Sequence, residues 1–194
     1  MLLGLIAVSI GYLLGSIPAA YAMAKLRKGI DIREVGAGNM GAGNVIREIG
    51  LIEGLVVGGV DIGKGAATIL IAQALGVSQL WVLAAGFAAI LGHIFPVYIG
   101  FRGGQGVSTA IGIFAVLSPL STLIVLLPLG ALMATTRQIF ASTLIIGPLL
   151  PLVIWLVDGE RILIAYALFI VLFLLYRSRR RFREVRQFTG RITR

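Results

Sequence analysis

Two glycine-rich segments flanked by charged residues interrupt this apolar chain, GAGNMGAGN at 36–44 and GFRGGQGV at 100–107. Glycine costs backbone entropy and adds no side-chain packing, so its repeated use needs a reason. Glycines allow positive φ, and successive N–H groups can then form a concave nest that accepts phosphate oxygens. The pattern therefore predicts anion binding by exposed backbone amides.

The first segment repeats the tetrad GAGN on either side of Met40, and Asn39 and Asn44 add neutral side-chain donors. Arg47 follows three residues later and can pair with a phosphate. The simpler alternative is a flexible loop with helix caps, because Gly-Asn favours turns.

The second segment places Gly103, Gly104 and Gly106 where an apolar helix is expected to begin. A helix N-terminus offers free amides and the positive end of its dipole, which suits a phosphate. Ser108 in the first turn would add a hydroxyl donor. The nearby His93 is the only histidine, and a lone membrane histidine more often bonds a neighbouring helix than acts as a base.

Asp61 and Lys64 stand inside an apolar stretch. Ionisable groups inside a bilayer are costly and are usually functional or paired. A spacing of three places both on one helix face. They either line a polar site or only neutralise each other.

Two further basic clusters are expected on one membrane side. Arg137 lies among Thr135, Thr136 and Ser142, and this cluster alone is equally typical of an ordinary positive-inside anchor. The arginines after Tyr176 predict a basic segment lying on anionic lipid headgroups.

The elements that must position these residues are membrane helices. Hydrophobic residues make up 58% of the 194 residues and the mean hydropathy is +1.01, against roughly 45–50% apolar residues in soluble domains. The chain has no cysteine and one histidine, which excludes disulfides, thiolate sites and a histidine-rich metal cluster. The net charge of +9 is better explained by topology and anionic lipid than by nucleic acid.

We expect an all-α polytopic protein of about seven transmembrane helices. The predicted spans are about 2–25, 53–75, 79–99, 105–117, 119–135, 139–157 and 161–176. Ser118-Pro119 should separate the fourth from the fifth, and Pro128, Pro148 and Pro151 should kink helices. The start of the chain lacks a basic region and a cleavage site, which favours a retained helix over a signal peptide.

Basic residues then fall on alternate loops, which places the N-terminus outside and the C-terminus in the cytoplasm. Both glycine-rich segments lie on the cytoplasmic face in this arrangement. The predicted organisation is a seven-helix membrane domain at 1–176 and a basic cytoplasmic tail at 177–194, in a bacterial inner membrane. A phosphorylated substrate meeting a lipid-soluble partner at the inner leaflet follows from this arrangement.

These residues resemble a known family, the bacterial acyl-phosphate-dependent glycerol-3-phosphate acyltransferases (PlsY). The resemblance is carried by GAGNMGAGNVIREIG at 36–50, DIGKG at 61–65 and GHIFPVYIGFRGGQGVSTAIG at 92–112. It implies that the sn-1 hydroxyl of glycerol 3-phosphate attacks the carbonyl of an acyl phosphate, giving lysophosphatidic acid and inorganic phosphate. A donor phosphate oxygen can take the proton, so neither a protein base nor a metal, coenzyme A or other cofactor is implied.

The resemblance and the spacing together give the candidate site. The candidate catalytic residues are Asn39, Asn44 and Ser142. The candidate substrate-binding residues are Gly38, Gly41, Arg47, Asp61, Lys64, Gly103, Gly104, Gln105, Gly106, Ser108 and Arg137. The expected partners are glycerol 3-phosphate, acyl phosphate and anionic membrane lipids, and the oligomeric state stays open.

The chain departs from the family pattern at several polar positions. Ala37, Gly43 and Gln105 stand where the family has serine, threonine and lysine, and Arg180 and Arg183 stand where its tail has histidine and asparagine. Loss of the lysine removes a cation from a site for two anions. An alternative is therefore a degenerate paralogue that binds, transports or senses a phospholipid or lipid phosphate. An ion-coupled transporter using Asp61 and Lys64 is weaker, because no inverted repeat is present.

Overall fold

The structure is a computed structural model that describes residues 1–136 and 139–179, and every regular element in those ranges is helical. The chain divides into two compact units, Met1–Leu117 and Ser118–Arg194, each described by itself. The predicted tail boundary at 176/177 falls inside the last helix of the second unit. It stays a prediction.

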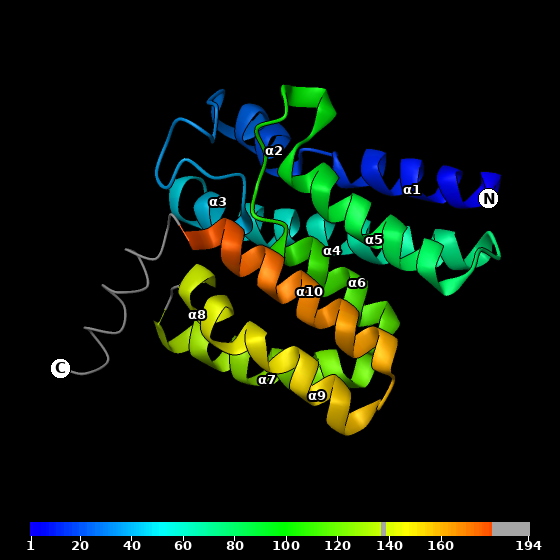
Figure 1. The fold of residues 1–194 in the computed structure, drawn as a ribbon. Helices are drawn as coiled ribbons and strands as arrows, with labels where there is room; N and C mark the ends of the chain where they lie inside the picture. The colour runs from blue at the N-terminus through cyan, green and yellow to red at the C-terminus, as the bar shows by residue number, and fades with distance from the viewer. Residues whose placement is uncertain (137–138, 180–194) are drawn as a thin grey trace. The chain divides into compact units, whose positions relative to one another are not determined.

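The first unit contains both glycine-rich segments. Its elements are α1 (Leu2–Gly15), α2 (Ala19–Lys28), α3 (Ala42–Glu48), α4 (Leu51–Ala74), α5 (Gln79–Ile94), the 3₁₀ turn η1 (Val97–Ile99) and α6 (Val107–Leu117). Helix α1 lies alongside α5 and also packs on α4, and α6 packs on α4 (Figure 1). The glycine-rich segments connect α2 to α3 and η1 to α6.

Glycines let these helices approach closely. A β-carbon at Gly15 in α1 would collide with the backbone of Ala89 in α5. Between α4 and α6, a β-carbon at Gly112 would collide with the carbonyl of Ile62. Small residues are the usual means by which membrane helices pack, since lipid supplies no hydrophobic drive between them.

The second unit contains α7 (Pro119–Thr136), α8 (Ile139–Ile146), the 3₁₀ turn η2 (Gly147–Leu149), α9 (Leu150–Val157) and α10 (Arg161–Ser178). Helices α8, α9 and α10 follow one another through short connections, and α9 packs on both α7 and α10. The hydroxyls of Ser118 and Ser121 both donate to the Asp158 carboxylate, which ties the start of α7 to the end of α9.

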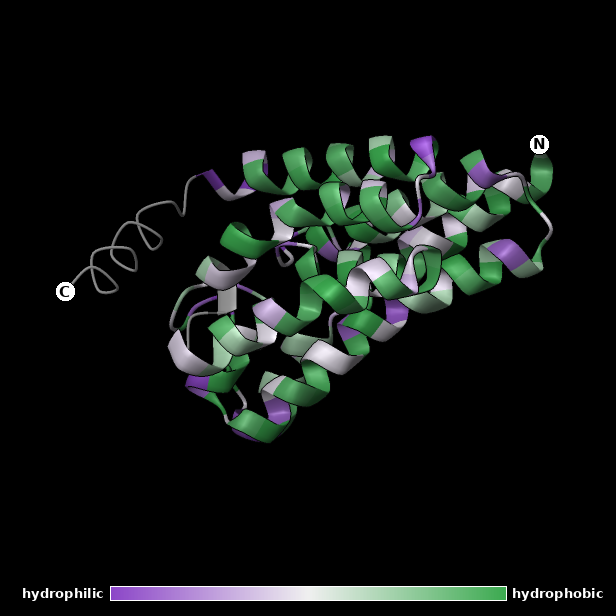
Figure 2. Ribbon diagram, turned by 90° about the horizontal axis from the view of Figure 1, so that it is seen from below, coloured by the Kyte–Doolittle hydropathy of each residue, from purple (hydrophilic) through white to green (hydrophobic). Residues whose placement is uncertain are grey.

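The described helices fit a membrane protein. Five are long and apolar enough to cross a bilayer: Leu2–Lys28, Leu51–Ala74, Gln79–Ile99, Pro119–Thr136 and Arg161–Ser178. Two shorter apolar segments, Val107–Leu117 and Ala141–Val157, lie where the fourth and sixth spans are predicted. Hydrophobic residues cover most of the helices along their length (Figure 2). The all-α membrane class is confirmed, and seven crossings remain a proposal.

Proline positions account for the helix ends. Helix α6 ends at Leu117 and α7 begins at Pro119, as predicted from Ser118-Pro119. The turn η2 interrupts the sixth predicted span next to Pro148. The first predicted span, 2–25, corresponds to the candidate crossing Leu2–Lys28, but its helix is interrupted at 16–18, where Pro18 has no N–H to continue the ladder.

A matched pair of glycines tests the close packing of α4 and α6. Gly112→Ala should lower stability by about 1–3 kcal/mol, because the added carbon meets the Ile62 carbonyl. Gly63→Ala in α4 meets no atom within 4 Å and should stabilise by about 0.5–1 kcal/mol through helix propensity. Thermal unfolding in detergent measures both changes. Equal effects at the two positions would contradict the packing.

Candidate functional site

Asn44 in α3 organises the first glycine-rich segment. Its side chain is buried, its Oδ1 accepts the N–H of Ala37, and its Nδ2 lies 3.1 Å from the carbonyl oxygens of Ile32, Val35 and Asn39. The two amide protons are thus shared among three acceptors. The Asn44 side chain thus bonds four backbone groups of the protein, and its predicted catalytic role stays a prediction.

The glycines of this segment serve the same fold. Gly36 and Gly38 have positive φ, and a β-carbon at Gly36 would collide with the Asn44 side chain. The Gly38 N–H donates to the carbonyl of Val35. The amides of Ala37 and Gly38 are therefore not free for a phosphate, contrary to the predicted open nest. Gly41 is the N-cap of α3 and lies against the Asn39 side chain.

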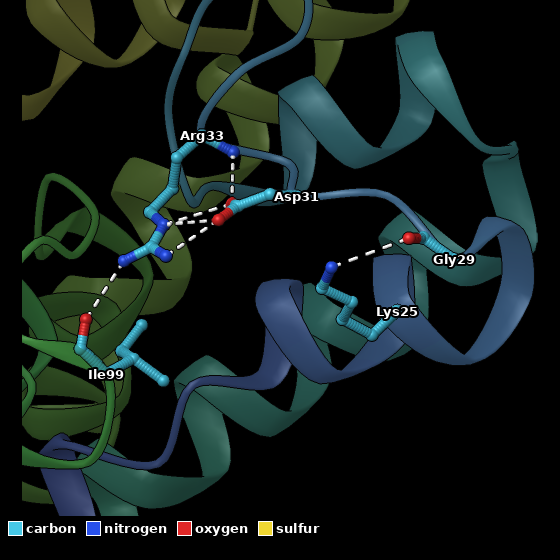
Figure 3. Close-up of polar contacts among 5 residues, drawn as sticks. All are labelled: Lys25, Gly29, Asp31, Arg33 and Ile99. Carbon is cyan, nitrogen blue, oxygen red and sulfur yellow. Dashed lines mark hydrogen bonds and ion pairs between the residues drawn. The ribbon is translucent and has the colours of Figure 1, made fainter.

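Arg47 and Arg33 have different surroundings. Arg47 lies in the last turn of α3, is exposed, and makes no hydrogen bond or ion pair with residues 1–136 or 139–179. Arg33 is held firmly: its Nη2 lies 2.7 Å from Asp31 Oδ2 and its Nη1 donates to the carbonyl of Ile99 at 2.9 Å (Figure 3). The guanidinium also lies over the Tyr21 ring, 5.1 Å from its centroid. Arg47 is thus available to a ligand, whereas Arg33 links the two glycine-rich connections.

The ion pair with Arg33 lowers the pKa of Asp31. Hydrogen bonds from the Arg33 side chain lower the pKa of the Asp31 carboxyl to about 2, although partial burial opposes the shift. The Arg33 N–H also donates to Asp31 Oδ1, which closes a local turn. Lys25 at the end of α2 bonds the carbonyl of Gly29 nearby (Figure 3).

The second glycine-rich segment is fixed to the end of α5. The N–H groups of Gly103 and Gly104 donate to the carbonyls of Ile94 and His93, each at 3.0 Å. The prediction that these two amides are free is wrong, because the unpaired carbonyls of the α5 C-terminus take them. Gly106 has positive φ and leads into α6.

The two glycine-rich segments meet at Gly104. A β-carbon there would collide with the His93 ring and would lie 2.8 Å from the carbonyl oxygen of Met40. Glycine is therefore needed at 104 for close approach, not for a free amide. Gln105 lies beside this contact, and its buried Oε1 accepts no hydrogen bond from any described residue. Ser108 is half-buried in the first turn of α6.

Asp61 and Lys64 form a buried ion pair that includes more than the two predicted partners. Their charged atoms are 2.8 Å apart, and Lys64 Nζ also donates to the carbonyl of Ile17 at 3.1 Å. On the other side, His93 Nδ1 lies 3.4 Å from Asp61 Oδ1. The pair therefore joins the α1–α2 break to the residue that carries the second glycine-rich segment.

These groups line one pocket of the first unit. Its volume is about 190 Å³ including the open mouth, and its walls come from both glycine-rich segments, α4, the α1–α2 break and the end of α5. The lining residues are Ile17, Pro18, Ala19, Ala20, Met40, Asp61, Lys64, His93, Pro96 and Gly104. A concave site with a few convergent polar groups is the expected form of a ligand site.

The other predicted site residues lie elsewhere. Ser142 belongs to the second unit, where it is buried and its hydroxyl lies 3.3 Å from that of Thr136. Arg137, Arg180 and Arg183 lie outside the described residues. Sequence analysis missed the roles of Arg33 and His93. The Asp-x-Arg spacing at 31–33 is typical of a local ion pair and could have predicted it. Nothing in the sequence spacing links His93 to Asp61.

Comparison with known proteins identifies the family. A family model described as glycerol-3-phosphate acyltransferase matches residues 5–187. The chain belongs to this family. Among curated relatives, the glycerol-3-phosphate acyltransferase of Geobacter sulfurreducens is 38% identical over 97% of both chains. Glycerol-3-phosphate acyltransferase 1 of Deinococcus radiodurans is 38% identical over 98% of this chain and 96% of its own.

Two solved structures share the fold. Crystal structures of PlsY (YgiH), an integral membrane glycerol 3-phosphate acyltransferase, match in a glycerol 3-phosphate form with a TM-score of 0.86 and 34% identity. The lysophosphatidic acid form matches with a TM-score of 0.84 and 33% identity. Each match covers 97% of this chain and 93% of the solved chain. The family predicted from the residues is confirmed.

The ion pair between Arg33 and Asp31, here called the Arg33 clamp, should make stability depend on pH. The lowered pKa of Asp31 means that the clamp stabilises the fold above the unfolded pKa of about 3.9 and loses this effect as the pH falls toward about 2. Arg33→Gln should therefore lower the melting temperature at pH 7, and its difference from wild type should shrink between about pH 5 and about pH 2. Thermal unfolding across this range measures it.

Arg27→Gln is the control for this prediction. Arg27 is also an arginine near the end of α2, but its side chain is 56% exposed and its partner is Glu53. Its difference from wild type should not follow the Asp31 titration. A constant offset for Arg33→Gln down to pH 2 would contradict the clamp.

Proposed function

We propose that this chain transfers a fatty acyl group from acyl phosphate to the sn-1 hydroxyl of glycerol 3-phosphate at the cytoplasmic face of a bacterial inner membrane. The observation that carries the proposal is the meeting of both glycine-rich segments over a pocket lined by Asp61, Lys64 and His93, in a chain of the glycerol-3-phosphate acyltransferase family. The relatives' names supply the acceptor substrate. Acyl phosphate as the donor comes from the resemblance.

The reaction balances without a protein nucleophile. The hydroxyl oxygen bonds to the carbonyl carbon, the bond from that carbon to the phosphate oxygen breaks, and the proton leaves with inorganic phosphate. Phosphate is a good leaving group, so the protein's contribution is to orient two anionic substrates and to stabilise developing negative charge. The buried ion pair and the fixed glycine-rich segments suit this task because they hold their positions before substrate binds.

The described residues divide between binding and positioning. Arg47 is exposed and unpaired among the described residues, so we assign it to the phosphate of glycerol 3-phosphate. The half-buried Asn39 is the nearby neutral donor of the first segment. Asn44 and Arg33 hold the segments in place. Roles for Ser142 and Arg137 rest on the resemblance alone.

The membrane arrangement completes the proposal. Seven crossings with an external N-terminus place every strongly basic connection in the cytoplasm, as the positive-inside rule requires. The basic residues after α10 would meet anionic lipid headgroups there. The degenerate-paralogue alternative gains no support from the first segment: Ala37, where the family has serine, still donates its N–H to Asn44 and the loop keeps its fold.

Arg47→Ala tests the acceptor site. Removing a charge-assisted phosphate contact of roughly 1.5–3 kcal/mol should raise the KM for glycerol 3-phosphate by about ten- to a hundredfold. Asn39→Ala should also reduce turnover. The measurement is phosphate release from palmitoyl phosphate with glycerol 3-phosphate, using purified protein. Arg161→Ala, an exposed arginine at the start of α10, is the matched control and should leave the KM unchanged. Wild-type protein without phosphate release would refute the proposed activity.

Gln105→Lys tests the departure in the second segment. Gln105 has a buried Oε1 without a hydrogen-bond partner in the described chain, so a cation that replaces it loses no existing bond at that atom. Placing a cation beside the pocket should lower the KM for a phosphate-bearing substrate by several-fold or more. Gln105→Met, which adds no charge, is the control. An unchanged KM in both variants would show that position 105 does not face substrate.

A further inference from the structure

Phe101 has a backbone conformation that aromatic residues rarely adopt. Its φ is +60°, and every other residue with positive φ in 1–136 and 139–179 is a glycine. The left-handed region crowds Cβ against the backbone, so glycine or asparagine would fit there at lower cost. Strain of this kind persists in proteins where the side chain at that position has a use.

The fold does not require the Phe101 ring for its core. Phe101 is 56% exposed, so the described residues cover less than half of its surface. Its N–H donates to the carbonyl of Pro96 at 2.9 Å, and the Gly103 N–H donates to that of Ile94 at 3.0 Å. These backbone bonds would remain if the ring were removed. The ring is therefore presented to a partner outside the chain.

Phe101 belongs to an exposed apolar patch on the connection between α5 and α6. We call residues 95–101 the aromatic loop, which contains the 3₁₀ turn η1. Within it, Phe95, Val97 and Tyr98 are 41%, 39% and 55% exposed. A run of exposed large apolar side chains in one short segment is typical of an interaction surface.

Hydrogen bonds from two other segments hold the aromatic loop. The Tyr12 hydroxyl of α1 donates to the carbonyl of Phe95 at 2.7 Å. Arg33 Nη1 donates to the carbonyl of Ile99 at 2.9 Å (Figure 3). The exposed side chains are therefore carried on a fixed backbone, which lowers the entropy lost when the surface binds a partner.

The position and the neighbours of the aromatic loop fit the lipid–water interface. The candidate membrane span that contains α5 is Gln79–Ile99, so the loop lies at the end of that span. Arg33, which bonds the loop, and Lys25 both lie over the Tyr21 ring, 5.1 Å and 5.8 Å from its centroid. The exposed Arg102 follows the loop directly. Aromatic rings beside cations are typical of protein surfaces at a membrane interface that contains anionic lipid.

We propose that the aromatic loop is a membrane-interface anchor, with the rings of Phe95, Tyr98 and Phe101 in the headgroup region of the bilayer. Its partner is the lipid surface, and the left-handed backbone at Phe101 directs the ring there. Gly103 and Gly104 follow directly and are bonded to the end of α5, so the anchor fixes the depth of the second glycine-rich segment relative to the lipid. Anchoring needs no acyl transfer, so its test is independent of the proposed activity.

A spin label at position 102 measures the depth of the aromatic loop. The chain has no cysteine, so Arg102→Cys creates a single labelling site at an exposed residue next to Phe101. The labelled full chain is placed in nanodiscs of phosphatidylcholine and phosphatidylglycerol. Power-saturation EPR then compares collisions of the label with lipid-soluble oxygen and with a water-soluble nickel chelate. The label should be shielded from the nickel chelate and accessible to oxygen.

Variants at position 101 assign the shielding to the ring. Phe101→Asn removes the ring but keeps a residue that tolerates the left-handed region, and should raise the collision rate with nickel several-fold. Phe101→Trp keeps an aromatic ring and should leave the label shielded. Leu80→Asn is the matched control, because it removes an exposed apolar side chain at the opposite end of α5 and should not change the label.

Phe101→Gly separates the anchor from a role in folding. Glycine adopts a φ of +60° without strain, so this variant should raise the melting temperature in detergent by about 2–4 °C. The same variant should lose the shielding of the label in nanodiscs. A protein that becomes more stable while its loop leaves the lipid has the behaviour expected of an anchor.

Three results would overturn the assignment. Equal nickel accessibility with Phe101 and with Asn at position 101 would show that the ring does not enter the lipid. Dipolar broadening between labels on two copies, measured in vesicles of the same lipids, would assign the patch to a contact between copies of the chain. A lower melting temperature for Phe101→Gly would show that the ring stabilises the fold, which would explain its strained backbone without any lipid.

Discussion

The buried ion pair between Asp61 and Lys64 is the interaction on which the rest of the first unit depends. Two charges inside an apolar helix are tolerated only when their remaining hydrogen-bond capacity is used. Lys64 Nζ donates a further hydrogen bond to the Ile17 carbonyl, which is available because the helix breaks at Pro18. The Asp61 carboxylate also lies 3.4 Å from His93 Nδ1. The pair therefore fixes the helix break and the end of α5 relative to α4.

The glycine-rich segments build on that frame, and their glycines have a different purpose from the one that composition suggests. Gly103 and Gly104 complete the C-terminus of α5 with their amides. Gly104 also lets the Met40 carbonyl and the His93 ring approach. Gly103 and Gly104 are thus explained by close packing and by capping of the α5 C-terminus, although their pattern suggests phosphate binding.

Sequence patterns predicted the membrane class and most helix ends, because apolar length and proline act locally along the chain. Ser118-Pro119 separates two helices for this reason. The break at Pro18 carried the same local signal, but a long apolar run obscured it. The family was predicted from the glycine-rich motifs. Helix α3 was not predicted, since GAGN-type sequence favours turns and the helix depends on Asn44 filling its loop. His93 and Asp61 lie on different helices and meet only in the folded protein. Residue spacing along the chain therefore could not predict their contact.

Asn44 has a consequence for the energetics of substrate capture. One side chain engages four backbone groups of the segment before it, so hydrogen bonds within the protein hold these residues together. Loops that become ordered only on binding subtract that conformational entropy from affinity. Here that entropy is lost during folding, because the hydrogen bonds of Asn44 lie within the protein. A small, highly hydrated metabolite can then be captured with the free energy of only a few contacts.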